Sequence, residues 1–505
     1  MPEFTPFFET LSDDPEVVRL LDASVGAVLI RNGCTMSRAP MDIEDVAQHI
    51  SDWITAAIRN KAPWLGRVNS NNVPLKLAKC HTLDMLTHEA NKALRLALQK
   101  YEFATPIYGE EEIIAHLDEG YTLVRLLAEA ALKREGFMMQ HCIGLGAYDI
   151  ALTQPGVEFL SLRDRMGKAH ATIEVVDGDI LQLKGKQNRP PLPPYLNMLA
   201  PVLRSRGLKV QPKKTVDGIV EAEDGQLHSI YDLPENFRAS QVYAYHHRDL
   251  TSLPNGMSTI GSLTIYGSGL LKVPDDIQAG GSLDVERSRR LSSFGERVTV
   301  GGNLCIGGCQ SLTALPADLH VEANLYTRWH DMFGDLELED EFCDGLTDIP
   351  SSVYIGGDIY LDGCRELQTF PADLKIRKSL NIDGTKIEHL PERLVVPGHL
   401  YLGGGHLRAL PKTLHVGKNL RVDLHGFGLL LAAIDARHDL VVGGSVYVEG
   451  KPISINLKKY PDDDPQYKKW SEDGRWYSYE PPDDLPAPEP MWTKVPPFTR
   501  FPPSD

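Results

Sequence analysis

The residue types with the greatest capacity for chemistry gather between positions 141 and 188. His141 and Cys142 are adjacent, and a turn at Gly144 and Gly146 follows them. A cysteine becomes a strong nucleophile when a base or a cation favours its thiolate. Neighbouring side chains on an extended segment point apart, so the base for Cys142 would have to be His170 or another residue.

Three segments after this pair alternate apolar and polar residues as half-buried strands do. We predict strands over Val157 to Arg163, Ala169 to Val176 and Asp179 to Lys184. Turns at 165–167 and 177–178 would join them, so the simplest fold is an antiparallel meander.

Alternation assigns each residue of the meander to one of two faces. The apolar face would carry Leu160, Leu162, Ala171, Ile173, Val175, Leu181 and Leu183. The polar face would carry Ser161, Arg163, His170, Thr172, Glu174, Gln182 and Lys184. We expect the apolar face to pack on helices, and the polar face to be either solvated or a functional site.

The polar face and the His-Cys pair supply the candidate site. The candidate catalytic residues are His141, Cys142, Arg163, His170, Glu174 and Gln182. The candidate ligand-binding residues are Tyr148, Ser161, Lys184, Lys186 and Asn188. Arg163, Lys184 and Lys186 could hold a phosphate of DNA, RNA or a nucleotide. No metal site is predicted, because His141, Cys142 and His170 lack a fourth ligand, and the residues imply no particular cofactor.

The order of these polar residues resembles that of PcfJ-like proteins, which conjugative plasmids, phages and other mobile elements encode. The matching positions are Glu135, Gly136, Met138, His141, Cys142, Gly144, Tyr148, Ser161, Leu162, Arg163, Thr172, Ile173, Glu174, Val175, Gln182, Gly185 and Asn188. The run GLGAY departs from the pattern by an extra residue or two before Tyr148. The resemblance implies a bacterial mobile-element setting and carries no specific reaction.

Charge is distributed unevenly along the chain. The whole chain has a net charge of −17, whereas positions 133 to 214 hold 13 Lys or Arg against 7 Asp or Glu, a net of +6. The acidic total argues against nucleic-acid binding by the whole chain. The basic segment could bind nucleic acid or phosphate, or dock on the acidic remainder.

The positions before the meander are predicted to be helical. Apolar residues recur three and four apart over 43 to 60, over 87 to 103 and, across a break at Gly120, over 110 to 136. No run approaches the ~20 apolar residues that cross a bilayer, and the start lacks a secretory pattern. Seven scattered cysteines form no disulfide framework. We therefore expect a cytoplasmic protein without membrane contact, and the resemblance to PcfJ-like proteins implies that it is bacterial; a translocated effector is the alternative.

An apolar-Pro pair recurs through the second half, mostly at intervals of 20 or 21 residues. Its members are Leu233-Pro234, Leu253-Pro254, Val273-Pro274, Leu315-Pro316, Ile349-Pro350, Phe370-Pro371, Leu390-Pro391 and Leu410-Pro411. Short alternating runs at 261–267, 302–308, 357–363, 378–384 and 398–404 lie between them. Units this short bury their apolar side only by stacking, which predicts a leucine-rich-repeat-like solenoid. Cys309 and Cys364 fall at equivalent places, as inner structural residues do.

The expected fold is an α+β N-terminal domain, with helices and a small meander, followed by this β-solenoid. Its regions are 1–136 (helical), 137–214 (meander module), 227–450 (solenoid) and 451–505, a Pro-rich and acidic tail expected to be disordered. We expect a binding or adaptor protein whose solenoid engages a protein partner and whose module binds nucleic acid or a phosphate ligand. The alternative is a Cys/His- or Arg/Glu-centred hydrolase or transferase with its site on the polar face of 141–188.

Overall fold

The computed structural model describes residues 4–32, 34, 43–99, 107–210, 216–329, 341–455 and 457. The chain forms two compact units. The first unit comprises Met1–Leu291 and Trp329–Glu341, and the second comprises Ser292–Arg328 and Phe342–Asp505. Most of the predicted 451–505 tail lies outside the described residues. Among the described helices, none has the length and apolar composition that a membrane crossing requires.

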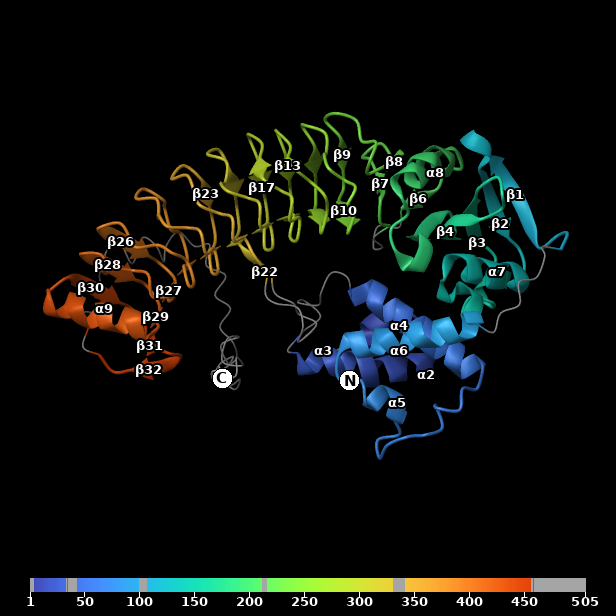
Figure 1. The fold of residues 1–505 in the computed structure, drawn as a ribbon, viewed down its shortest axis with the longest axis horizontal. Helices are drawn as coiled ribbons and strands as arrows, with labels where there is room; N and C mark the ends of the chain where they lie inside the picture. Colours follow the sequence, from blue (N-terminus) through green and yellow to red (C-terminus); the bar gives the residue numbers. More distant parts are fainter. Residues whose placement is uncertain are drawn as a thin grey trace, which may run out of the picture. The chain divides into compact units, whose positions relative to one another are not determined.

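The first unit begins with a bundle of helices (Figure 1). These are α1 Thr5–Phe8, α2 Pro15–Leu21, the π-helical η1 Asp22–Gly26, α3 Ala27–Arg31, α4 Ile43–Arg59, α5 Leu75–Ala78 and α6 Leu83–Gln99. Their apolar stripes meet in one core that contains Phe8, Ile50, Ile54 and Leu86. The helix predicted over 43–60 is confirmed as α4. The helix predicted over 87–103 is confirmed as α6 up to Gln99 and begins earlier, at Leu83; positions 100–103 lie outside the described residues.

A six-stranded sheet follows the bundle. Its strands are β1 Glu111–His116, β2 Thr122–Leu126, β3 Val157–Arg163, β4 Ala169–Val176, β5 Asp179–Lys184 and β6 Lys209–Val210. Neighbours pair in chain order, antiparallel except for the parallel pair of β5 and β6. The three predicted strands are confirmed at the expected bounds. The meander is therefore the centre of a larger sheet.

The helix predicted over the first part of 110–136 is wrong. Residues 111–126 form the β1–β2 hairpin, and only α7 (Glu129–Met139) is helical. The turn η3 (Asp118–Gly120) places Glu119 at φ 57° and Gly120 at φ 78°. A positive φ breaks a helix and is easy for glycine, so the chain reverses where a helix would have continued.

Two helices cover the sheet on opposite faces (Figure 1). Helix α8 (Pro193–Ser205) packs on the apolar face, where the buried residues are Leu160, Leu162, Ala171, Ile173, Val175, Ile180 and Leu183. The predicted apolar face is confirmed except at Leu181, because a bulge pairs Val175 with Ile180 instead. Helix α7 and the 3₁₀ segment η4 (Cys142–Leu145) cover the polar face. On the polar face, Ser161, Arg163 and Thr172 are therefore buried, whereas Glu174, Gln182 and Lys184 are half-buried.

Short parallel strands continue through the rest of the first unit. They are β9 Arg238–Ala239, β10 Val242–Tyr245, β11 Ser258–Thr259, β12 Leu263–Tyr266, β13 Lys272–Val273, β14 Gln278–Ala279 and β15 Leu283–Asp284, preceded by the hairpin β7 Ile219–Glu221 and β8 Leu227–Ser229. Strands β10, β12 and β15 pair in register on one side of the coils, and β9, β11 and β14 on another. This is the predicted solenoid pattern.

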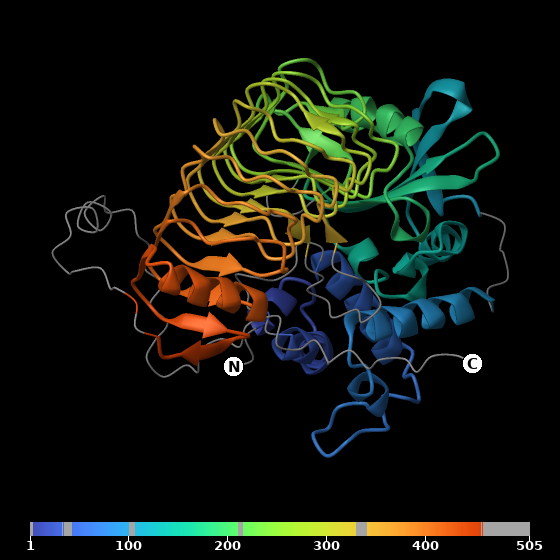
Figure 2. The ribbon, with the colours of Figure 1, turned by 60° about the vertical axis from the view of Figure 1, so that its left-hand side comes forward.

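The second unit consists of stacked coils of the same kind (Figure 2). Its strands are β16 Ser293–Phe294, β17 Thr299–Val300, β18 Leu304–Cys305, β19 His320–Val321, β20 Leu325–Tyr326, β23 Tyr354–Ile355, β24 Ile359–Tyr360, β25 Leu380–Asn381, β26 Arg393–Val396, β27 Leu400–Leu402, β28 Thr413–Val416, β29 Leu420–Val422, β30 Asp439–Val442, β31 Val446–Val448 and β32 Lys451–Ile453. The short strands β21 (Arg328–Trp329) and β22 (Glu341–Phe342) flank residues 330–340.

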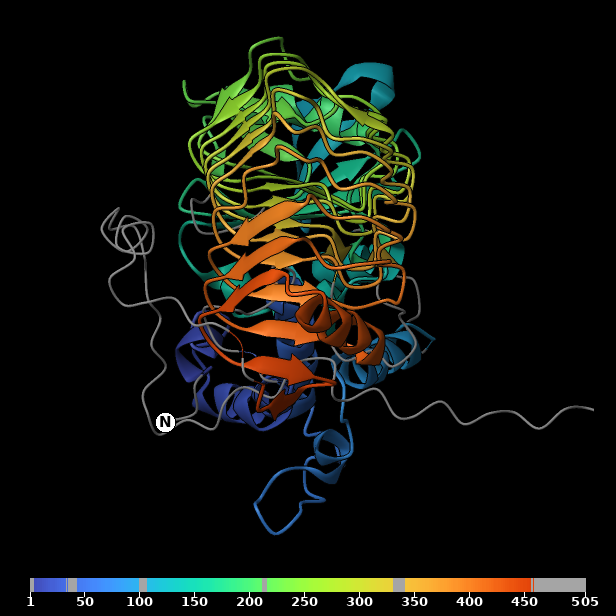
Figure 3. The same ribbon diagram turned by 90° about the vertical axis from the view of Figure 1, so that its left-hand side faces the viewer.

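Each coil of the second unit adds one rung to a buried ladder. Leu325, Leu380 and Leu400 occupy equivalent inward positions and are at most 1% exposed. Cys309 and Cys364 are fully buried, as predicted for inner structural residues. Near the end of the unit, α9 (Leu424–Asp435) takes the place of a loop and lies beside the last strands (Figure 3).

Candidate functional site

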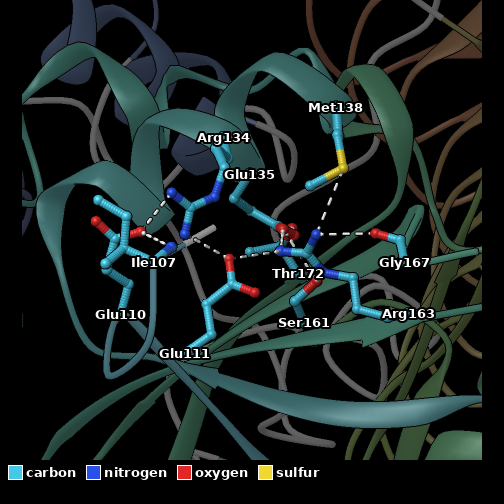
Figure 4. Close-up of polar contacts among 10 residues, drawn as sticks. All are labelled: Ile107, Glu110, Glu111, Arg134, Glu135, Met138, Ser161, Arg163, Gly167 and Thr172. Carbon is cyan, nitrogen blue, oxygen red and sulfur yellow. Dashed lines mark hydrogen bonds and ion pairs between the residues drawn. The ribbon is translucent and has the colours of Figure 1, made fainter. Parts of the chain in front are cut away.

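A buried ion cluster joins α7 to the polar face of the sheet (Figure 4). Its centre is Glu135 of α7, whose side chain is fully buried. Arg163 of β3 donates from Nη2 to Glu135 Oε2 at 2.6 Å, and Ser161 Oγ donates to the same oxygen at 2.9 Å. Thr172 Oγ1 of β4 donates to the other carboxylate oxygen. The strand alternation creates this cluster, because Ser161, Arg163 and Thr172 all face α7.

The remaining donors of Arg163 also have partners inside the protein. Its Nε donates to Ser161 Oγ at 2.6 Å, and Nη1 donates to the Gly167 carbonyl at 3.2 Å and to the Met138 sulfur at 3.4 Å. Burial raises the pKa of Glu135, against the lowering effect of Arg163 and the two hydroxyls. A buried charge pair needs such complete hydrogen bonding to offset its desolvation. The cluster therefore has a structural role: it holds α7 against the sheet.

A second arginine extends the cluster toward the hairpin. Arg134 is only 1% exposed and bonds Glu110 at 2.6 Å and Glu111 at 3.0 Å. Glu111 also lies 3.9 Å from Arg163. The hairpin, helix α7 and strand β3 are thus linked by one continuous network of charges.

A separate polar group lies around Asp52 of α4. The Asp52 Oδ2 atom accepts from the Cys142 thiol at 2.8 Å and from the Tyr148 hydroxyl at 3.0 Å. Burial, followed by the Asp52 charge, raises the pKa of the Cys142 thiol and of the Tyr148 hydroxyl well above their usual values. Burial also raises the pKa of Asp52. Cys142 is consequently a protonated donor in this structure, and a thiolate nucleophile there is disfavoured.

His141 turns away from Cys142, as its place beside that residue predicts. Its Nε2 atom is bonded to the Gly185 carbonyl, which only accepts, so Nε2 carries a proton. Burial lowers the pKa of His141 to about 4, and the ring is neutral at pH 7. Only Nδ1 is left to accept a proton.

Several predicted site residues surround one small cavity of about 40 Å³. Its lining includes His141, Cys142, Tyr148, Thr172, Glu174, Gln182, Lys184 and Asn188. A cavity needs roughly 10–15 Å³ to hold one water molecule, whereas ligand sites span about 300–1,000 Å³. The cavity has room for a very small number of water molecules and is too small for a nucleotide.

Four of the predicted site residues lie elsewhere. Arg163 and Ser161 belong to the buried ion cluster, and Lys186 is exposed on the 3₁₀ segment η6 (Lys186–Asn188). His170 lies on the opposite face of the sheet, so its predicted place on the polar face is wrong. A bulge pairs Arg163 with Ala169 and shifts His170 toward α8.

His170 is held on that opposite face by aromatic and polar contacts. Its ring lies 4.6 Å from the ring of Tyr195, and its Nε2 atom lies 3.0 Å from an Asp164 carboxylate oxygen. His170 therefore cannot act as the base for Cys142 in this structure. Among the described residues, no three His, Cys, Asp or Glu side chains are grouped as metal ligands would be.

The sequence prediction missed Asp52, Arg134 and Glu135 as members of these clusters. Glu135 is one of the positions that match the PcfJ-like pattern, so the sequence did contain a signal for its importance. Asp52 lies 90 residues before Cys142, and its polar role depends entirely on how α4 packs.

The basic segment that was predicted to bind nucleic acid or phosphate is only part of a larger folded domain, so the net charge has to be counted over that whole domain. The sheet includes the acidic hairpin, so the relevant described stretch is 107–210. That stretch contains 12 Lys and Arg residues and 13 Asp and Glu residues, a net charge of −1. The folded sheet domain has no cationic excess to attract a polyanion.

Comparison with known proteins gives no relative: no family model, no curated protein and no solved structure matches the chain.

Proposed function

We propose that this chain is a binding protein whose solenoid holds a protein partner on the outward face of its parallel sheet. The observation that carries the proposal is a row of aligned outward residues in the second unit. The row consists of Cys305, Tyr326, Tyr360, Asn381, Tyr401, Arg421 and Tyr447. Tyrosine and arginine are enriched where proteins bind one another.

The solenoid presents this row on a rigid support. Each outward residue is flanked by buried inward side chains, which are leucine, isoleucine or valine except for Thr327 beside Tyr326. Neighbouring strands are about 4.8 Å apart, and the rings of Tyr326 and Tyr360, on adjacent strands, stack with their centroids 5.0 Å apart. A tyrosine held in this way gives contact area at a small cost in conformational entropy.

The first unit supports a scaffolding role for the meander module. Its buried ion cluster and the Asp52 group bind helices to the sheet, and their hydrogen bonds are made within the protein. The resemblance to PcfJ-like proteins adds a mobile-element setting to the proposal. With a net charge of −1, the folded sheet domain gives nucleic-acid or phosphate binding no electrostatic support.

An enzyme remains the second candidate, because His141, Cys142, Glu174 and Gln182 do line one cavity. Against it stand the protonated thiol and the small volume. Replacing Glu174 by Gln preserves shape and removes the charge. If the cavity performs the function, this variant should keep the wild-type melting temperature and lose the biological effect of the protein.

The binding proposal is tested by photocrosslinking in cells that express the full chain. In the test variant, a photoreactive phenylalanine replaces Tyr401 on the outward row. In the control variant, the same amino acid replaces Tyr354, because β23 lies on another side of the coils. We expect a discrete protein adduct at position 401 and none at 354. Adducts at 354 alone, or at neither position, would contradict the proposal.

A further inference from the structure

One position of the outward row, Asn381, carries a short side chain between two tyrosines, and we call this position the gap. Tyr360, Asn381 and Tyr401 are direct neighbours on three consecutive strands, so a short amide stands between two tyrosines. Two strand spacings place those tyrosine backbones about 10 Å apart. The side chain of Asn381 accepts a hydrogen bond from the Asp383 amide, which keeps it close to its own strand.

The same row shows what fills such a gap elsewhere. Arg421 stands between Tyr401 and Tyr447, and its guanidinium carbon lies 5.4 Å and 5.1 Å from the two ring centroids. The rings of Tyr326 and Tyr360 stack at 5.0 Å with an angle of 7° between their planes. Tyr360 therefore presents its ring faces along the row. This geometry suits a flat cation inserted between rings better than a sugar stacked on an outward ring face.

The gap is bordered by carboxylates. Asp383 lies two residues beyond Asn381, in the turn that follows β25, and Asp362 occupies the equivalent place in the preceding coil. Asp362 pairs with Arg328 at 3.3 Å. The Asp383 carboxylate accepts from the Gly403 amide, and in the described part of the chain no ion pair includes it. Burial raises the pKa of Asp383 to about 7, aided by the Asp362 and Asp423 carboxylates and opposed by Arg421.

We infer that the gap at Asn381 receives an arginine or lysine side chain from a basic segment of a protein partner. The cation enters between Tyr360 and Tyr401 and pairs with the Asp383 carboxylate. This inference rests on the proposed function and adds the chemistry of the partner. Two ring faces and a half-buried carboxylate form a receptor for one cationic side chain, and the continuing row supplies contact for the residues around it.

The experiment measures binding of the full chain to fluorescein-labelled (Gly-Arg)₅ by fluorescence anisotropy, with (Gly-Gln)₅ as the uncharged control. We expect the arginine peptide alone to bind. Asp383→Asn and Tyr401→Leu should each weaken binding about tenfold, and Asn381→Arg should abolish it by placing a cation of the chain's own in the gap. Glu392→Gln removes an equal charge from the exposed Glu392–Lys412 pair and should leave binding unchanged.

Each other outcome has a definite meaning. If Glu392→Gln weakens binding as much as Asp383→Asn, the attraction is general to the acidic surface and the inference fails. Equal affinity for spermine and for the peptide would identify a small-cation site instead. An adduct at position 401 without peptide binding would overturn the inference and keep the proposed function. The absence of both would overturn both, and unchanged melting temperatures establish that the variants fold.

Discussion

Replacing Arg163 by Met isolates the contribution of the buried ion cluster. The side chain is about as long as the one it replaces, so the main loss is the charge and its hydrogen bonds to Glu135, Ser161 and Gly167. Breaking a buried ion pair from one side typically costs about 3–5 kcal/mol, because the remaining charge is left uncompensated. We expect a loss of that size at pH 8, since Glu135 is fully buried.

The loss should depend on pH in a direction that the structure sets. Burial already raises the pKa of Glu135, and Arg163 is the strongest influence that lowers it. In the variant the pKa rises further, whereas an unfolded glutamate titrates near ~4.3. Stability therefore falls as pH rises above that unfolded value, because the unfolded chain ionises where the folded one resists. The defect should be smaller at pH 5 than at pH 8.

Hydrogen exchange of the β3 and β4 amides in the full chain measures this effect, because it reports on the sheet separately from the solenoid. Arg125→Met is the matched control: Arg125 lies on the same sheet, 38% exposed and 3.9 Å from Glu158. That exposed pair should be worth less than ~1 kcal/mol. Adding Glu135→Leu to Arg163→Met should restore much of the protection. Equal effects of the two single arginine variants, or a strictly additive double variant, would refute an ion-pair role.

Other expectations concern separate parts of the chain. Iodoacetamide at pH 8 should leave Cys142 unmodified in the folded protein, because its pKa is raised, and should label the partly exposed Cys305, as peptide mass spectrometry would show. Gly136→Ala should lower stability by about 1–3 kcal/mol, since the alanine Cβ would lie 2.7 Å from a backbone nitrogen of η4. An unchanged melting temperature would count against this close packing of α7 on η4. Affinity for (Gly-Arg)₅ should rise from pH 6 to pH 8 as Asp383, with a pKa of about 7, ionises; Asp383→Asn should flatten the curve.

The sequence correctly predicted the elements whose hydrophobic periodicity fits only one type of secondary structure. Strands β3, β4 and β5 alternate cleanly between turns, and the solenoid repeats itself. The β1–β2 hairpin was different, because Ile113, Ile114, Leu117 and Val124 satisfy a helical spacing as well as a strand pattern. Only the reversal at Gly120 decided between the two periods, and a glycine there also fits a break between helices.

The faces of the meander could be predicted, but the segments that cover them could not. Alternation placed Ser161, Arg163 and Thr172 together, yet their partner Glu135 comes from a helix. Asp52, the partner of Cys142 and Tyr148, comes from a more distant helix. Local periodicity carries no information about such tertiary neighbours. Bulges added a second error, since one extra residue in a strand moves a side chain to the other face, as happened to His170.

The family-like pattern acquires a physical meaning from these contacts. Gly136 and Gly144 let α7 and η4 approach at backbone distance, and Glu135 ties the helix to Arg163 and Thr172. Such a pattern can recur wherever a helix must be fastened to a sheet, whatever the protein does. The outward row of the solenoid is only half-buried, and its members change from cysteine to tyrosine, asparagine and arginine while the inward ladder stays aliphatic. Under the proposed binding function, this variation on a rigid support assigns the choice of partner to the second unit.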